Sequence, residues 1–84
     1  MGGYQKVKFR CMDDLNKLPL FKEAHALIQK TYKKKFSGKL GNIKEVSSQL
    51  VSGTNYKIVY HTNCGGKVYY VVYTQPWTKT VKIT

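Results

Sequence analysis

This chain of 84 residues contains two cysteines and two histidines, Cys11, His25, His61 and Cys64, and both residue types take part in nucleophilic catalysis and in zinc binding. A hydrolytic site needs a nucleophile, a base and an orienting acid, and neither histidine has an Asp or Ser arranged near it for that purpose. A zinc site usually starts from a Cys-x-x-Cys or His-x-x-x-His pair, and the sequence has no such pair. We therefore expect no enzyme activity, no metal site, no cofactor and no small-molecule substrate.

A second group of residues could bind a partner, because apolar side chains stand where the strand pattern predicts hairpin tips, which normally face water. The first tip is Gln49-Leu50-Val51-Ser52-Gly53, and the second is Gln75-Pro76-Trp77. Asn, Asp or Gly would suit a purely structural turn better than Leu50 and Val51, and Trp77 offers a large rigid surface. Exposed apolar tips predict insertion into a pocket of a binding partner. The alternative for Trp77 is that its side chain folds back onto Tyr73 or the sheet edge.

The elements that must hold these tips begin with a strand and a helix. Alternation from Tyr4 to Cys11 predicts a first strand, in which Val7 and Phe9 share one face. Asn16 is suited to cap a helix that tolerates Pro19 in its first turn and continues to Lys35. Apolar residues recur along this helix at helical spacing, so it should lie on a sheet with its other face in water.

Four more segments are rich in Val, Ile, Thr and Tyr with a period of two, which predicts strands at 43–51, 55–61, 67–74 and 78–84. The side chains expected in the core are Tyr56, Ile58, Tyr60, Val68, Tyr70, Val72, Val81 and Ile83. Short connections favour an antiparallel meander. The predicted fold is therefore α+β, a single domain over residues 1–84 with one long helix packed across a five-stranded antiparallel sheet.

Strand direction then predicts where the tips lie. If the first strand is antiparallel to the second, the chain start and the first and third hairpin tips share one end of the sheet. Cys11 and the turn containing Cys64 should fall at the other end. A disulfide between these cysteines would close a loop of over 50 residues and stabilise the fold by roughly 3–4 kcal/mol, but a strand lies between them. Two separate buried thiols are the alternative.

The charge balance indicates a second class of function. Lys and Arg number 15 against four acidic residues, giving a net charge of +11, and such a field attracts polyanions and acidic proteins. Binding to nucleic acid or to an anionic membrane is therefore an alternative, through residues that include Lys6, Lys8, Arg10, Lys30, Lys33, Lys34 and Lys35. Because the tyrosines mostly alternate along strands, core packing is the commoner explanation for them, and nucleic acid is not the favoured partner.

Two cellular locations are compatible with the sequence. No apolar run approaches the roughly 20 residues of a membrane-spanning helix, and no apolar secretory segment follows Met1. Either the protein is cytoplasmic, or it is secreted and the chain begins after processing.

The order of the motifs resembles the cystatin family of inhibitors of papain-like cysteine proteases. The resemblance covers nearly the whole chain: a glycine near the start, strand, long helix, strand, a Gln-x-Val-x-Gly loop, two strands, a Pro-Trp loop and a final strand. It implies a protein that blocks cathepsin L-, cathepsin B- or papain-type enzymes by inserting an apolar wedge into the active-site cleft. The implied contact residues are Gly2, Gly3, Gln49, Leu50, Val51, Ser52, Gly53, Pro76 and Trp77.

Three departures from the family pattern change these expectations. Only Met1 and Gly2 precede Gly3, so the N-terminal arm should contribute little. One cysteine in each half fits neither the secreted nor the stefin type. Asn42 is too close to Gln49 to act against legumain, so we predict no inhibition of that enzyme. We expect monomers, with a domain-swapped dimer as a minor state because β-branched Val51 stands in a tight tip.

Overall fold

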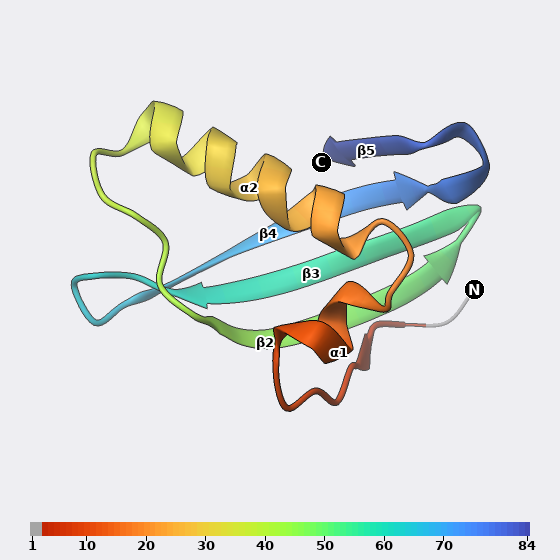
Figure 1. The fold of residues 1–84 in the computed structure, drawn as a ribbon, viewed down its shortest axis with the longest axis horizontal. Coiled ribbons are helices and arrows are strands. Elements are labelled where there is room, and N and C mark those ends of the chain that lie inside the picture. Colours follow the sequence, from red (N-terminus) through yellow and green to blue (C-terminus); the bar gives the residue numbers. More distant parts are fainter. Residues whose placement is uncertain (1–2) are drawn as a thin grey trace.

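The computed structural model describes residues 3–84 as a sheet covered on one face by a helix (Figure 1). The elements, in chain order, are β1 (Gln5–Lys6), α1 (Met12–Asn16), α2 (Phe21–Lys35), β2 (Ile43–Val51), β3 (Gly53–His61), β4 (Lys67–Gln75), the 3₁₀ turn η1 (Pro76–Thr78) and β5 (Thr80–Ile83). The strands form one antiparallel sheet in the order β1-β2-β3-β4-β5. The predicted α+β class, with one main helix on a five-stranded antiparallel sheet, is confirmed, and α1 is an addition to it.

The core lies between α2 and the covered face of the sheet. Phe21, Ala24 and Ile28 of α2 are buried against sheet residues that include Tyr56, Ile58, Tyr60 and Val72. The two tyrosines are placed there with their hydroxyls satisfied: Tyr56 donates to the Pro19 carbonyl oxygen at 2.9 Å, and the Tyr60 hydroxyl lies 2.8 Å from His25 Nδ1. Val68, Tyr70, Val81 and Ile83 are partly buried against this cluster, so the predicted core is confirmed.

The predicted start of the long helix is wrong. Asn16 is not its cap but the last residue of α1, and α2 begins at Phe21 after Leu20, which has a left-handed φ of 58°. The residue before a proline is disfavoured in helical conformation, so the chain turns at Leu18-Pro19 instead of continuing one helix. Leu15 of α1 is completely buried in the core, and this burial accounts for the extra helix.

The predicted first strand is too long. Of residues 4–11, only Gln5 and Lys6 pair with β2, opposite Ser48 and Ser47, and one further backbone bond joins Val7 N to Val46 O at 2.9 Å. Val7 and Phe9 still pack partly buried against the core. The alternation therefore indicated correctly which side chains face the core, but it did not require ladder hydrogen bonds.

Both cysteines differ from the expectations. Cys11 and Cys64 are free and exposed, so neither a disulfide nor a pair of buried thiols is present. The chain leaves the sheet after β1, so Cys11 ends up just before α1, while Cys64 lies in the turn between β3 and β4. Neither helix within residues 3–84 is long and apolar enough to cross a membrane.

Candidate functional site

The register of the sheet brings the two predicted tips together at one end. Val51 pairs with Gly53 to close the β2–β3 hairpin, and Gln75 pairs with Thr80 to close the β4–β5 hairpin. Thr54 lies opposite Thr74, so the second hairpin starts directly beside the first tip. Figure 1 shows both hairpins at the right-hand end of the molecule.

Gly53 permits this close approach. Its φ is +112°, a conformation that side-chain-bearing residues rarely adopt, and a Cβ there would overlap the carbonyl oxygen of Thr74. The same Cβ would lie 3.0 Å from the Tyr73 hydroxyl oxygen. Glycine is therefore required at this position both by backbone conformation and by the neighbouring strand β4.

Polar side chains hold the first tip in place. The Tyr73 hydroxyl of β4 donates to the Ser52 carbonyl oxygen, so the tip is tied to a strand other than its own. Across the hairpin, Asn55 Nδ2 donates to Gln49 Oε1 at 3.2 Å. The tip is therefore connected to its surroundings by more than its turn.

The second tip is a 3₁₀ turn with its own polar contacts. Pro76 begins the turn, and the Lys79 N–H donates to the Pro76 carbonyl oxygen at 3.1 Å. The Thr78 hydroxyl donates to Gln75 Oε1 at 2.9 Å and lies 2.7 Å from the Thr80 hydroxyl. Since proline also fixes its own φ, this turn presents Trp77 from a defined backbone.

The apolar side chains at these tips face solvent. Leu50 is 76% exposed and Trp77 is 66% exposed, while Val51 is half-buried. The alternative in which Trp77 folds back onto Tyr73 or the sheet edge is therefore wrong. We call Leu50, Val51, Pro76 and Trp77 the apolar edge. Exposed large side chains concentrated at one place are typical of interaction sites.

The N-terminal segment runs toward the same edge. Gln5 lies opposite Ser48 in antiparallel pairing, so the residues before it lead toward Leu50. Gly3 is exposed, and a Cβ added to it would meet no atom within 4 Å. The Tyr4 side chain that follows is 41% exposed. Gly2, the other predicted hinge residue, lies outside the described residues.

Tyr4 and Tyr73 are site residues that sequence reasoning missed. Tyr4 could have been noticed as an aromatic residue directly after the glycines. Tyr73 gave no separate signal, because its role depends on the register that places it beside Gly53 and Ser52.

The histidines are placed for packing. His25 lies between the rings of Phe21 and Tyr60, with centroid distances of 6.3 and 5.7 Å, and burial lowers its pKa below the ordinary value. His61 ends β3, at the opposite end of that strand from Gly53. Within residues 3–84, no group of three or more His, Cys, Asp or Glu side chains could hold a metal ion.

Comparison of the chain with protein-family models, with curated proteins and with solved structures found no match. Interpretation of the edge therefore depends on its chemistry. Its side chains are apolar and carry no nucleophile, and the backbone at each tip is held by hydrogen bonds. Such an arrangement can fill a groove in another molecule.

Proposed function

We propose that this protein is a reversible, tight-binding inhibitor of papain-like cysteine proteases with a cystatin-like fold. The observation that carries the proposal is that Leu50 and Trp77, from hairpins in different parts of the chain, are both largely exposed at the same end of the sheet. The order of the motifs, from Gly3 through the Gln-x-Val-x-Gly loop to Pro76-Trp77, supports the same interpretation.

In this proposal, the apolar edge enters the protease cleft on both sides of the catalytic cysteine. Leu50 and Val51 fill one part of the cleft, Trp77 fills another, and the segment at Gly2 and Gly3 adds a minor contact. The first tip resists cleavage because its backbone is held in a tight turn and bonded to Tyr73. An extended, mobile segment would fit a protease as a substrate, whereas a rigid turn occupies the cleft without being cut.

In this proposal Trp77 is the aromatic anchor of the apolar edge. Aromatic anchors at the centre of interfaces often contribute roughly 2 kcal/mol or more on truncation, which corresponds to about a thirtyfold change in affinity. Trp77 is 66% exposed in the free protein, so its removal should cost little folding free energy. Loss of binding and loss of stability can therefore be separated at this residue.

The test is active-site titration of papain, cathepsin L and cathepsin B. We expect one-to-one inhibition by the wild-type protein and an inhibition constant raised about thirtyfold for Trp77→Ala, with an unchanged urea midpoint. Tyr69→Ala is the matched control, because Tyr69 is also a largely exposed aromatic residue, at 60%, but lies outside the apolar edge. Absence of inhibition of all three enzymes at micromolar protein would refute the proposal.

A second candidate is a basic binding module for nucleic acid or anionic membranes. The face of the sheet that α2 does not cover favours this function, because lysines lie on it. Lys6 and Lys57 both lie opposite Ser47 in the register, so their side chains share this face, and Lys57 Nζ lies 4.8 Å from the centre of the Tyr69 ring. The side-chain interaction of Lys44 with Lys67, together with the repulsion between their two positive charges, lowers the pKa of Lys44 below its ordinary value. This function predicts a steep salt dependence of binding and no effect of Trp77→Ala.

A further inference from the structure

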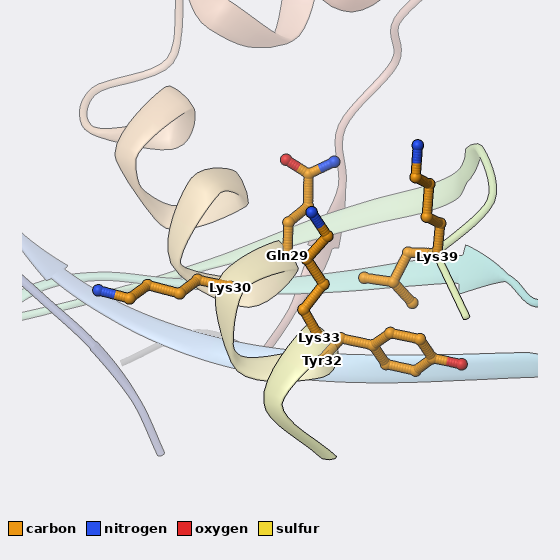
Figure 2. A pocket seen from close by; sticks show the side chains of 6 residues that line it. Gln29, Lys30, Tyr32, Lys33 and Lys39 are labelled. Carbon is orange, nitrogen blue, oxygen red and sulfur yellow. The ribbon is translucent and has the colours of Figure 1, made fainter. Parts of the chain in front are cut away.

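A cavity of about 500 Å³ lies between the C-terminal half of α2 and the connection to β2 (Figure 2). Its lining residues are Gln29, Lys30, Tyr32, Lys33, Lys39 and Leu40. The volume lies within the range of small-molecule sites, about 300–1,000 Å³. The cavity adjoins the C-terminal end of α2 and the segment before β2, whereas the apolar edge lies where β2 ends. In Figure 1 these are opposite ends of the molecule.

Among the described residues, the lysines of this cavity have no acidic partner. The ion pairs within residues 3–84 are Lys6–Glu45 and Arg10–Asp14, and neither includes a lining residue. Lys33 is also favourable as a cation in the last turn of α2, where the helix dipole is negative. Lys39 lies beyond the end of α2, so the dipole does not account for its place beside the same cavity.

The polar groups of the lining converge in part. In Figure 2 the side chains of Gln29, Lys33 and Lys39 extend in the same direction, with the Gln29 amide near the end of Lys33 in this view, while Lys30 extends to the left. An amide can both donate and accept hydrogen bonds. The cavity therefore presents two cations and one neutral polar group toward the same side.

The remaining lining is apolar. Tyr32 is half-buried, and its ring packs against Phe36 at a centroid distance of 4.7 Å and an angle of 30°. Leu40 packs against the hydrophobic core. A ring held in this way offers a fixed flat surface, which suits the C–H face of a saturated ring better than a single small ion.

We propose that this cavity binds a six-membered polyol ring carrying two or more sulfate or phosphate groups, such as a sulfated sugar unit or an inositol phosphate. The ring would lie on Tyr32, Lys33 and Lys39 would each bind one anionic group, and Gln29 would bind a hydroxyl. A neutral sugar would leave both ammonium groups without partners. A single inorganic ion would not use the apolar wall.

The first test is calorimetric titration of the purified wild-type protein with two charged probes, a trisulfated heparin-derived disaccharide and inositol hexakisphosphate. Unsulfated disaccharide, myo-inositol and inorganic sulfate are the matched controls. We expect saturable one-to-one binding of at least one charged ring and no measurable binding of the controls at the same concentrations. The two charged probes distinguish a sulfated glycan from an inositol phosphate as the source of the chemistry. Failure of both probes to bind, or equally tight binding of inorganic sulfate, would overturn the inference.

The second test separates this cavity from the general positive field. The double variant Lys33→Gln/Lys39→Gln should raise the dissociation constant of the bound probe about tenfold or more, because each lysine makes a charge-assisted contact. Lys22→Gln/Lys82→Gln removes the same charge away from the cavity and should raise it less than about threefold. Equal weakening in the two double variants would refute a specific site. No protease is present, so the outcome is independent of the proposed inhibition.

Discussion

At the scale of single residues, Gly53 at the first hairpin tip has surroundings that leave no room for a side chain. Its positive φ and the nearby Thr74 carbonyl oxygen both act against any side chain. Gly65 provides a matched comparison, because its φ of +81° is also left-handed while a Cβ there would meet nothing within 4 Å. The two glycines therefore separate backbone strain from steric overlap.

We predict that Gly53→Ala lowers the free energy of unfolding by about 2–4 kcal/mol, since strain and overlap add. Gly65→Ala should cost only about 1 kcal/mol, from backbone strain alone. Urea denaturation followed by circular dichroism measures both values. Equal losses of unfolding free energy in the two variants would show that steric overlap with β4 does not restrict position 53.

The sequence carried enough information to identify most of the edge residues, but not all. Leu50, Val51 and Trp77 stand out because an apolar residue at a tip contradicts the usual composition of turns. The hydrogen bond from the Tyr73 hydroxyl to the Ser52 carbonyl oxygen could not be predicted from residue types alone. Tyrosine is an ordinary strand residue, and only the pairing of β3 with β4 shows which backbone group its hydroxyl reaches.

At the scale of elements, the two hairpins of the edge are coupled through that same hydrogen bond. Removing the hydroxyl in Tyr73→Phe should leave the strands paired but let the first tip move relative to β4. We predict an inhibition constant for papain raised about threefold to tenfold, in line with a net hydrogen-bond contribution of about 0.5–1.5 kcal/mol. Steady-state inhibition assays measure the change.

Tyr69→Phe is the control for this prediction, because Tyr69 is on the same strand but pairs with Val59, away from the tip. It should leave the inhibition constant unchanged. If both variants weaken inhibition equally, the hydroxyl of Tyr73 has no special role in positioning the tip.

Strand elements could be predicted better than the N-terminal third of the chain. The bounds of β2 agree with the sequence pattern, and β3 begins only two residues earlier than predicted, at Gly53. The early segments differ because Leu15 reaches the core from the short helix α1, while Val7 and Phe9 reach it from irregular chain between β1 and α1. Apolar periodicity indicates which side chains are buried, and several backbone paths can achieve the same burial.

At the scale of the whole molecule, His25 links stability to pH. Burial lowers its pKa below 6.5 in the folded protein, so the unfolded chain takes up a proton more readily. The contribution of neutral His25 to the free energy of unfolding is therefore fully present above about pH 6.5, the ordinary histidine value. It decreases as the pH falls through that value toward the folded pKa.

We predict that the free energy of unfolding decreases between about pH 7.5 and about pH 5.5, on either side of the ordinary histidine value, and that His25→Gln reduces this dependence. Glutamine can still bond the Tyr60 hydroxyl and does not titrate. Asp and Glu side chains ordinarily titrate near about pH 4, below this range. Urea midpoints at several pH values measure the effect, and an identical pH profile for the variant would contradict it.

The bond from Tyr73 to Ser52 has a further consequence for association. Two independently moving tips would each lose conformational entropy when they enter a groove, whereas tips that already move as one body lose it only once. Preorganisation of this kind favours binding without any added contact area. The hydroxyl should therefore be visible in the entropy of complex formation more than in its enthalpy.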